Sequence, residues 1–195
     1  MSVGIILTRI VENNTHGDRV DIRAVAEEFG CAFGEPFEDS TLRGLLQPSN
    51  NPGVLGVFSF NKKNTEAENN TITALLMAEL VLSLDAFSIK KFKCDVFFLS
   101  SMRQWRTSAQ MLLATRLAIP KHIFEALDNI NFRSAEYAFN HHLMPAFVGS
   151  AYFITEGMNL FGFLSQDTVR VGNIGRLPSQ VLDKYAPQPQ AARSA

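Results

Sequence analysis

The sequence predicts an α+β fold in which a small β-sheet packs against mainly α-helices. Apolar residues recur at helical spacing in several segments, and residues 42–60 read as a β-hairpin with a turn at 49–53. A chain of 195 residues with 46% hydrophobic content is long enough to bury one core. We therefore expect a single domain over residues 1–186, followed by a disordered tail at 187–195.

The composition argues against several function classes. A formal charge of -1 gives no strong attraction to nucleic acid or anionic lipid, so direct nucleic-acid binding is not expected. The two cysteines, Cys31 and Cys94, are too few for a disulfide framework or a zinc knuckle. No apolar run approaches the roughly 20 residues that cross a bilayer. We expect a cytoplasmic protein with no membrane contact and no cofactor.

The N-terminal third predicts two helices and a hairpin. The first helix is expected over residues 3–12. Asp21 is a suitable N-cap for the second, and Gly30 is its stop signal. After a short strand in "CAFGEPF", the arms of the hairpin are predicted at 42–46 and 54–60. Both faces of the second arm are largely apolar, so we expect cover on both sides.

The segment "NNTITALLMAELVLSLD" is an apolar run interrupted by a single carboxylate, Glu79. We predict a helix here, capped by Asn70 or Thr71. A strand is expected in "FKCDVFFL", residues 92–99. Helices are then predicted over 102–116, 123–127, 133–142 and 150–163, with a break at Pro120 and with Ser150 as the cap of the last one.

Several pieces of the chain, taken in order, resemble the ImmA/IrrE family of zinc metallopeptidases. The pieces are "VDIRAVAEEFGCAF", "RGLL", "GVFSFN", "TITALLMAELVLS", "LLATRLAIP" and "HHLMPAFVGSAYFITEGMNLFGFL". They follow the family's succession of helix, strand, hairpin, HExxH helix and closing helices between residues 20 and 164. The resemblance implies a zincin-like metallopeptidase fold.

The resemblance does not extend to the zinc ligands. In the family, two histidines one helical turn apart hold zinc, and the glutamate between them is the general base. The matching window here is Ala78-Glu79-Leu80-Val81-Leu82, so alanine and leucine replace the two histidines. The third ligand, a glutamate in the family, falls near Arg106 and Thr107. The resemblance therefore implies a pseudoenzyme without zinc or peptidase activity, with Glu79 as the remnant of the general base.

Two environments are open for Glu79. It either faces solvent, as most glutamates do, or it points into the former cleft. A buried carboxylate needs a partner or a raised pKa, and Arg103 and Arg106 are the candidate partners.

Three function classes remain. The resemblance implies an antirepressor-like regulator that binds a helix-turn-helix transcription factor and controls a mobile-element, phage or stress circuit. Binding would use the strand "GVLGVFSFN" as a sheet edge over an apolar floor. The alternatives are a structural or assembly protein, including a homo-oligomer, that uses a Phe-rich surface, and a hydrolase with unrecognised catalytic residues. The predicted binding residues are Val54, Leu55, Val57, Phe58, Phe60 and Leu82.

Overall fold

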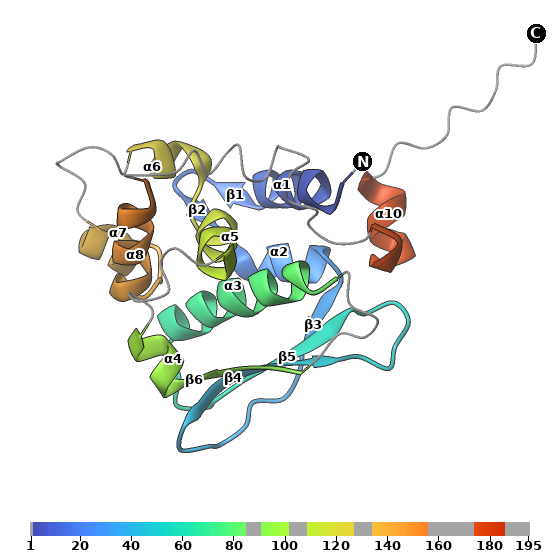
Figure 1. Ribbon diagram of the computed structural model, residues 1–195, viewed down its shortest axis with the longest axis horizontal. Coiled ribbons are helices and arrows are strands. Elements are labelled where there is room, and N and C mark those ends of the chain that lie inside the picture. Colours follow the sequence, from blue (N-terminus) through green and yellow to red (C-terminus); the bar gives the residue numbers. More distant parts are fainter. Residues whose placement is uncertain (1, 85–90, 102–108, 127–133, 156–173, 186–195) are drawn as a thin grey trace, which may run out of the picture.

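The computed structural model describes residues 2–84, 91–101, 109–126, 134–155 and 174–185 (Figure 1). The elements follow in this order: α1 (Val3–Asn13), β1 (Thr15–His16), β2 (Arg19–Val20), α2 (Ile22–Glu28), β3 (Cys31–Phe33), β4 (Leu42–Pro48), β5 (Gly56–Phe60), α3 (Glu66–Leu82), β6 (Phe92–Asp95), α4 (Val96–Ser101), α5 (Ala109–Ala118), α6 (Lys121–Ala126), α7 (Ser134–Asn140), α8 (Pro145–Thr155), η2 (Ile174–Arg176) and α10 (Ser179–Tyr185).

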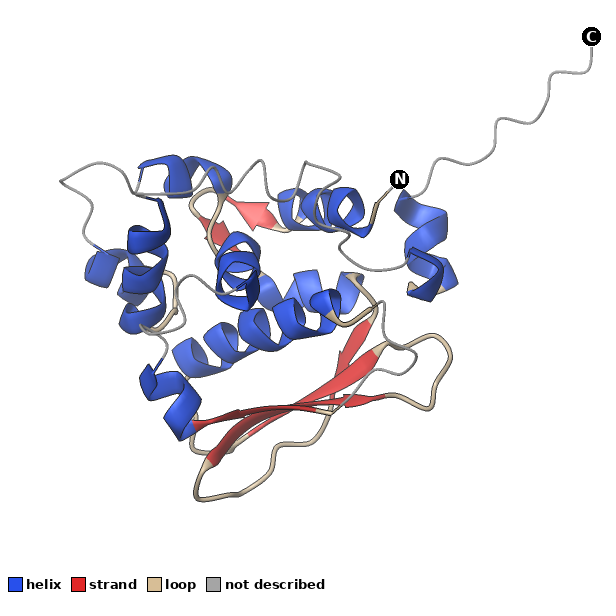
Figure 2. Cartoon of the chain, in the orientation of Figure 1, coloured by secondary structure: helices blue, strands red, loops and turns tan. Residues whose placement is uncertain are grey.

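The predicted α+β class, with a small sheet packed against mainly helices, is confirmed. Most of the helices lie on one side of a four-stranded sheet (Figure 2). The long helix α3 crosses the sheet and contacts β4 and β6. Helices α2 and α5 pack against α3. A second, two-stranded sheet is the antiparallel pair β1–β2, which the sequence analysis did not predict. The main core lies around α3.

The strand order of the larger sheet is β3-β5-β4-β6. β5 pairs in parallel with β3 and antiparallel with β4, so the predicted hairpin is confirmed. The prediction that residues 54–60 form a sheet edge is wrong, because β5 is bonded to a strand on both sides. The hairpin pattern in the sequence predicts β4 as one neighbour of β5. The second neighbour, β3, comes from earlier in the chain, and no local sequence pattern predicts its pairing with β5.

Gly44 allows the sheet to approach α3 closely. A Cβ at this position would lie 2.3 Å from Cγ2 of Ile72 and 3.6 Å from Cδ1 of Leu76, so only glycine fits without a shift. The β-ladder pairs Gly44 with Phe60 and Cys94, and residues paired in this way point to the same side of a sheet. We call the contact between β4 and the Ile72 face of α3 the α3–sheet seam.

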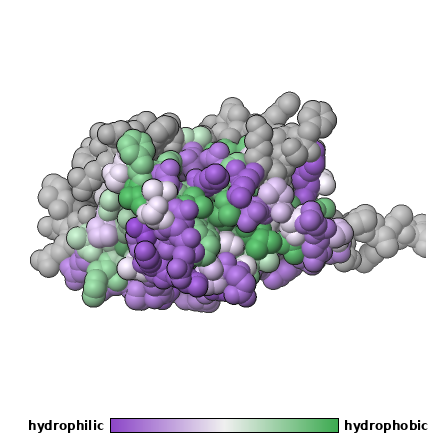
Figure 3. Space-filling view, turned by 90° about the horizontal axis from the view of Figure 1, so that it is seen from below, coloured by the Kyte–Doolittle hydropathy of each residue, from purple (hydrophilic) through white to green (hydrophobic). Residues whose placement is uncertain are grey.

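The face of the sheet that points away from α3 is more polar. Gln47 on β4 and Lys93 on β6 are exposed there, although Leu45 between them is buried. Figure 3 views the molecule from this side and shows hydrophilic residues over much of it.

Helix α3 begins earlier than the sequence analysis predicted. Its N-cap is Thr65, whose hydroxyl accepts a bond from the Glu68 amide while the Glu68 carboxylate accepts one from the Thr65 amide. The expected cap, Asn70 or Thr71, is therefore wrong, and the capping-box pair at 65 and 68 is the signal that was missed. Thr71 is buried and accepts a bond from the amide of Met144.

Several other boundaries confirm the predictions. The first helix is α1, Asp21 caps α2 through the amide of Ala24, and Gly30 follows α2 with a φ of +99°. Pro120 separates α5 from α6. The region 133–142 contains α7, as expected.

Two later boundaries correct the predictions. Segment 92–99 is a strand only as far as Asp95, whose carboxylate accepts a bond from the amide of Phe98 and so favours the helical turn of α4. Ser150 lies inside α8 rather than at its start, which is Pro145, a residue suited to the first turn of a helix. The predicted tail 187–195, residues 102–108 of one predicted helix and residues 156–163 of another lie outside the described residues.

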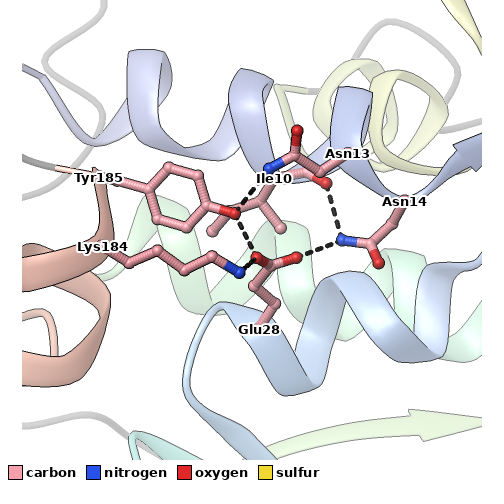
Figure 4. A network of polar contacts seen from close by, with 6 residues as sticks. All are labelled: Ile10, Asn13, Asn14, Glu28, Lys184 and Tyr185. Atoms are coloured by element: carbon pink, nitrogen blue, oxygen red, sulfur yellow. Dashed lines mark hydrogen bonds and ion pairs between the residues drawn. The ribbon is translucent and has the colours of Figure 1, made fainter.

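The last described helix, α10, packs beside α1 and α2 through a polar network (Figure 4). The Glu28 carboxylate accepts hydrogen bonds from Lys184, Tyr185 and Asn14. Asn13 donates a bond of 2.9 Å to the Tyr185 hydroxyl. We call this network of Asn13, Asn14, Glu28, Lys184 and Tyr185 the C-terminal clasp.

Within the described ranges, no helix is long and apolar enough to cross a membrane.

Candidate functional site

The window Ala78–Leu82, which the resemblance aligns with HExxH, lies in the last two turns of α3. Ala78 is fully buried, and Leu82 is partly buried against the core. The two positions that hold zinc in the resembling family therefore carry a methyl and an isobutyl group. Neither group has a lone pair with which to bind a metal ion.

Glu79 is half-buried and lies between these two residues. It is seven positions after Ile72, about two helical turns, so it leaves α3 on the side that faces the sheet. Burial raises the pKa of its carboxyl above the usual value. Among the described residues, no hydrogen bond or ion pair involves this carboxylate. Its predicted partners Arg103 and Arg106, and Thr107 beside them, lie outside the described residues, so that pairing stays a prediction.

A half-buried carboxyl with a raised pKa has the properties of a general acid or base. The described residues, however, supply no second titratable group within hydrogen-bond distance of Glu79. Burial also raises the pKa of both cysteine thiols to about 12, so neither Cys31 nor Cys94 ionises readily as a nucleophile.

No metal-binding group of three or more His, Cys, Asp or Glu side chains occurs in the part of the chain that the structure describes. Two of the histidines instead pair singly with carboxylates. Nε2 of His122 lies 2.8 Å from Asp18, and Nδ1 of His142 lies 3.7 Å from Glu66.

The predicted binding residues do not form one surface. Phe58 is fully buried, Leu55 is buried, and Val54, Val57 and Phe60 are partly exposed. Val57 and Phe58 point to opposite faces of the sheet because they are neighbours on one strand. Leu82 belongs to α3 and not to the strand.

The described edges of the sheet are β3 and β6. Over residues 92–95, β6 pairs with β4 on one side only, and no described strand pairs with its other side. The first turn of α4 follows directly and exposes two apolar side chains, with Val96 41% and Phe97 76% exposed. Both residues lie in the segment 92–99 that was predicted to be a strand, so they were not predicted as a binding surface.

A separate pocket of about 420 Å³ lies where β3 and β5 end, between α2 and the start of α3. Its walls combine cationic, amide and aromatic side chains, including Arg23, Phe33, Phe60, Lys62, Asn64 and Asn69. This pocket was not predicted from the sequence, because its lining residues come from four segments and match no motif.

Comparisons of the chain with protein-family models, with curated proteins and with solved structures found no match.

Proposed function

We propose that the chain is a non-catalytic regulatory protein that binds another protein, and that it is a degenerate relative of the ImmA/IrrE metallopeptidases. The observation that carries the proposal is the environment of Glu79, a carboxylate kept at the position of a general base between a buried alanine and a partly buried leucine. Without ligands at 78 and 82, a water molecule would not be activated there by zinc.

The order of elements supports the zincin-like part of this proposal. A capped helix, α2, leads into β3, an antiparallel hairpin follows, and the buried helix α3 then carries the Glu79 window across the sheet. This is the succession on which the resemblance rests.

The resemblance suggests a helix-turn-helix transcription regulator as the partner, held as an intact stoichiometric complex. The free side of β6 is a better docking edge than β5, because its backbone groups have no described strand partner. An extended segment of the regulator would add to this edge through main-chain hydrogen bonds, and Phe97 would supply apolar contact beside it.

The experiment compares two exposed phenylalanines. Purified chain is titrated against a panel of helix-turn-helix regulators from the same host, as the parent protein, as Phe97→Asp and as Phe139→Asp. Phe139 is 82% exposed on α7 and is the matched control for Phe97. We expect Phe97→Asp to weaken binding about tenfold or more, and Phe139→Asp to leave it unchanged.

Two results of this experiment would contradict the proposal. Cleavage of the bound regulator would show that the chain is an active peptidase. Equal binding by the parent and Phe97→Asp would exclude the β6 edge.

Leu82→Asp tests whether the old cleft takes part. A carboxylate at this partly buried position would have no described ion-pair partner. If the regulator covers residue 82, we therefore expect the substitution to weaken binding. An unchanged circular dichroism spectrum must first show that the variant is folded. Binding equal to that of the parent would restrict the interface to β6 and α4.

The exposure of Phe97 and Phe139 also favours a second candidate, an assembly protein that binds copies of itself. Sedimentation without any partner separates the two functions. A monomer at micromolar concentration argues against assembly, and a dimer that Phe139→Asp dissociates supports it.

A further inference from the structure

The pocket at the ends of β3 and β5 presents hydrogen-bond donors next to aromatic walls. It is distinct from the Glu79 window, which lies more than two helical turns along α3 from Asn69. The kind of ligand that the pocket can bind depends on which polar atoms of its walls already have hydrogen-bond partners.

Arg23 supplies most of the free donors. Its guanidinium carbon lies 4.3 Å from the centroid of the Phe33 ring, so the cation lies against the aromatic wall of the pocket. Its Nε is 3.2 Å from the Glu27 carboxylate. A guanidinium has five N–H bonds, and no described residue accepts from the Nη atoms of Arg23. Lys62 adds a second cation, whose Nζ is 3.2 Å from Glu38.

The amide side chains leave one further donor. Asn64 donates to the Arg43 carbonyl and to Oδ1 of Asn69, and both bonds are under 3 Å. Oδ1 of Asn64 has no partner among the described residues but is buried away from solvent, so a ligand does not reach it. Nδ2 of Asn69 is not engaged by any described residue.

The side-chain acceptors of the lining residues, the Oδ1 atoms of Asn61, Asn64 and Asn69, are therefore used or sealed, whereas several side-chain donors have no described acceptor. A ligand that satisfies them must bring acceptor oxygens, and the planar guanidinium matches a carboxylate best because it can donate two parallel bonds. The Phe33 and Phe60 rings, with centroids 5.9 Å apart, supply an apolar wall. The volume of about 420 Å³ lies at the small end of the range for ligand sites.

We propose that this pocket binds a carboxylate attached to an apolar or aromatic group, either a small organic acid or the C-terminal residue of a peptide. The existing ion pairs do not prevent this. The Arg23–Glu27 and Lys62–Glu38 pairs have side chains that are all more than half exposed, and ion pairs exposed to solvent contribute little to stability. A ligand carboxylate exchanges with them at little cost.

The test is an NMR titration of the full ¹⁵N-labelled chain with N-acetylphenylalanine and with its uncharged carboxamide. We expect the acid to bind about tenfold more tightly than the carboxamide, because charge-assisted bonds to Arg23 are lost with the charge. The amide signals that shift should include Gly34 and Asn69, which line the pocket.

Arg23→Gln should remove the preference for the acid, and Arg176→Gln is the matched control, since it removes the same charge from an exposed site outside the pocket. Equal binding of acid and carboxamide to the parent, or equal losses in the two variants, would overturn the proposal. So would shifts confined to another part of the chain.

A tripeptide that ends in phenylalanine distinguishes the two sources of the carboxylate. Tighter binding than N-acetylphenylalanine identifies a peptide C-terminus, equal or weaker binding identifies a small acid, and no binding of either probe overturns the site. The inference is independent of the regulator complex. Arg23→Gln is expected to leave regulator binding unchanged, so the two proposals fail separately.

Discussion

The α3–sheet seam and the C-terminal clasp join parts of the same chain by different means. The seam depends on the absence of a side chain at Gly44 and on buried aliphatic groups from Ile72 and Leu76. The clasp is built around one carboxylate, Glu28, which is 16% exposed and accepts bonds from three side chains. Shape controls the first region, and charge controls the second.

This difference determines which conditions disturb each region. Apolar packing does not titrate, so mutations that change volume should weaken the seam at every pH. A network centred on a carboxylate is sensitive to protonation, so the clasp should weaken in acid while the seam remains. Four substitutions separate the two regions, and they are ordered by the size of their expected effect on stability.

The largest effect is expected for Leu76→Ala in the seam. The Leu76 side chain is 2% exposed, and its removal leaves a cavity between α3 and β4, which should cost about 2–5 kcal/mol. Urea denaturation measures this cost. The control is Leu182→Ala on α10, where the side chain is partly exposed and the cost should be below about 2 kcal/mol. Equal costs would show that the two regions pack equally tightly.

Gly44→Ala should destabilise the chain by about 1–3 kcal/mol, because the new methyl group overlaps Cγ2 of Ile72. Gly53→Ala is the control, since a Cβ there would meet its nearest neighbour at an ordinary 3.5 Å. Ile72→Ala removes the overlapping atom, so the double variant should cost less than the sum of the two single changes. Strict additivity in thermal or chemical denaturation would contradict the close contact.

Glu28→Gln tests the clasp and should cost about 1–3 kcal/mol at pH 7. Burial alone would raise the pKa of Glu28, but hydrogen bonds from Lys184, Tyr185 and Asn14 lower it by more than burial raises it. The pKa of this carboxyl is therefore below its usual value. The stability from this carboxylate is therefore fully present above the unfolded pKa and is lost as the pH falls through the lower folded pKa. The difference in the free energy of unfolding between parent and variant should disappear in acid. A gap that is the same at pH 7 and pH 3 would contradict the charge model.

Glu79→Gln should have the smallest effect on the free energy of unfolding. Any change should stabilise the chain, whereas the other three substitutions destabilise it. Because burial raises the pKa of Glu79 in the folded state, its stability contribution is greatest below the unfolded pKa of about 4.5 and falls as the pH rises through the folded pKa. Glutamine does not ionise, so the variant should equal the parent or exceed it by up to about 0.5 kcal/mol at pH 7. It should also bind the proposed partner normally. A clear loss of stability would indicate an ion pair with residues outside the described ranges.

Local signals in the sequence were sufficient for much of the fold. Asp21 and Gly30 bound α2 correctly because caps and stops depend on a few neighbouring residues. Pro120 divides α5 from α6 for the same reason. The start of α3 was missed although its signal is also local, because the apolar run draws attention to residue 71 while the capping box lies at Thr65 and Glu68.

The features that the sequence did not predict depend on residues far apart in the chain. Whether β5 is an edge depends on β3, which pairs with it across more than twenty residues. The clasp joins Asn13 to Tyr185, and the pocket joins Arg23 to Phe60 and Asn69. No periodicity or motif spacing records such pairs, so they require the three-dimensional structure.

The span of the clasp has a consequence for the order in which the molecule assembles. The bond that Asn13 donates to Tyr185 spans 172 positions, and the bond that Tyr185 donates to Glu28 spans 157. The ladder of the β4–β5 hairpin, in contrast, closes over a short loop. Long loops close at greater entropic cost, and on a ribosome α1 and α2 emerge long before α10 exists. The hairpin and α3 can therefore form during synthesis, and the clasp closes only after residue 185 has emerged. Until then, the Glu28 carboxylate on the emerging chain remains without Lys184 and Tyr185.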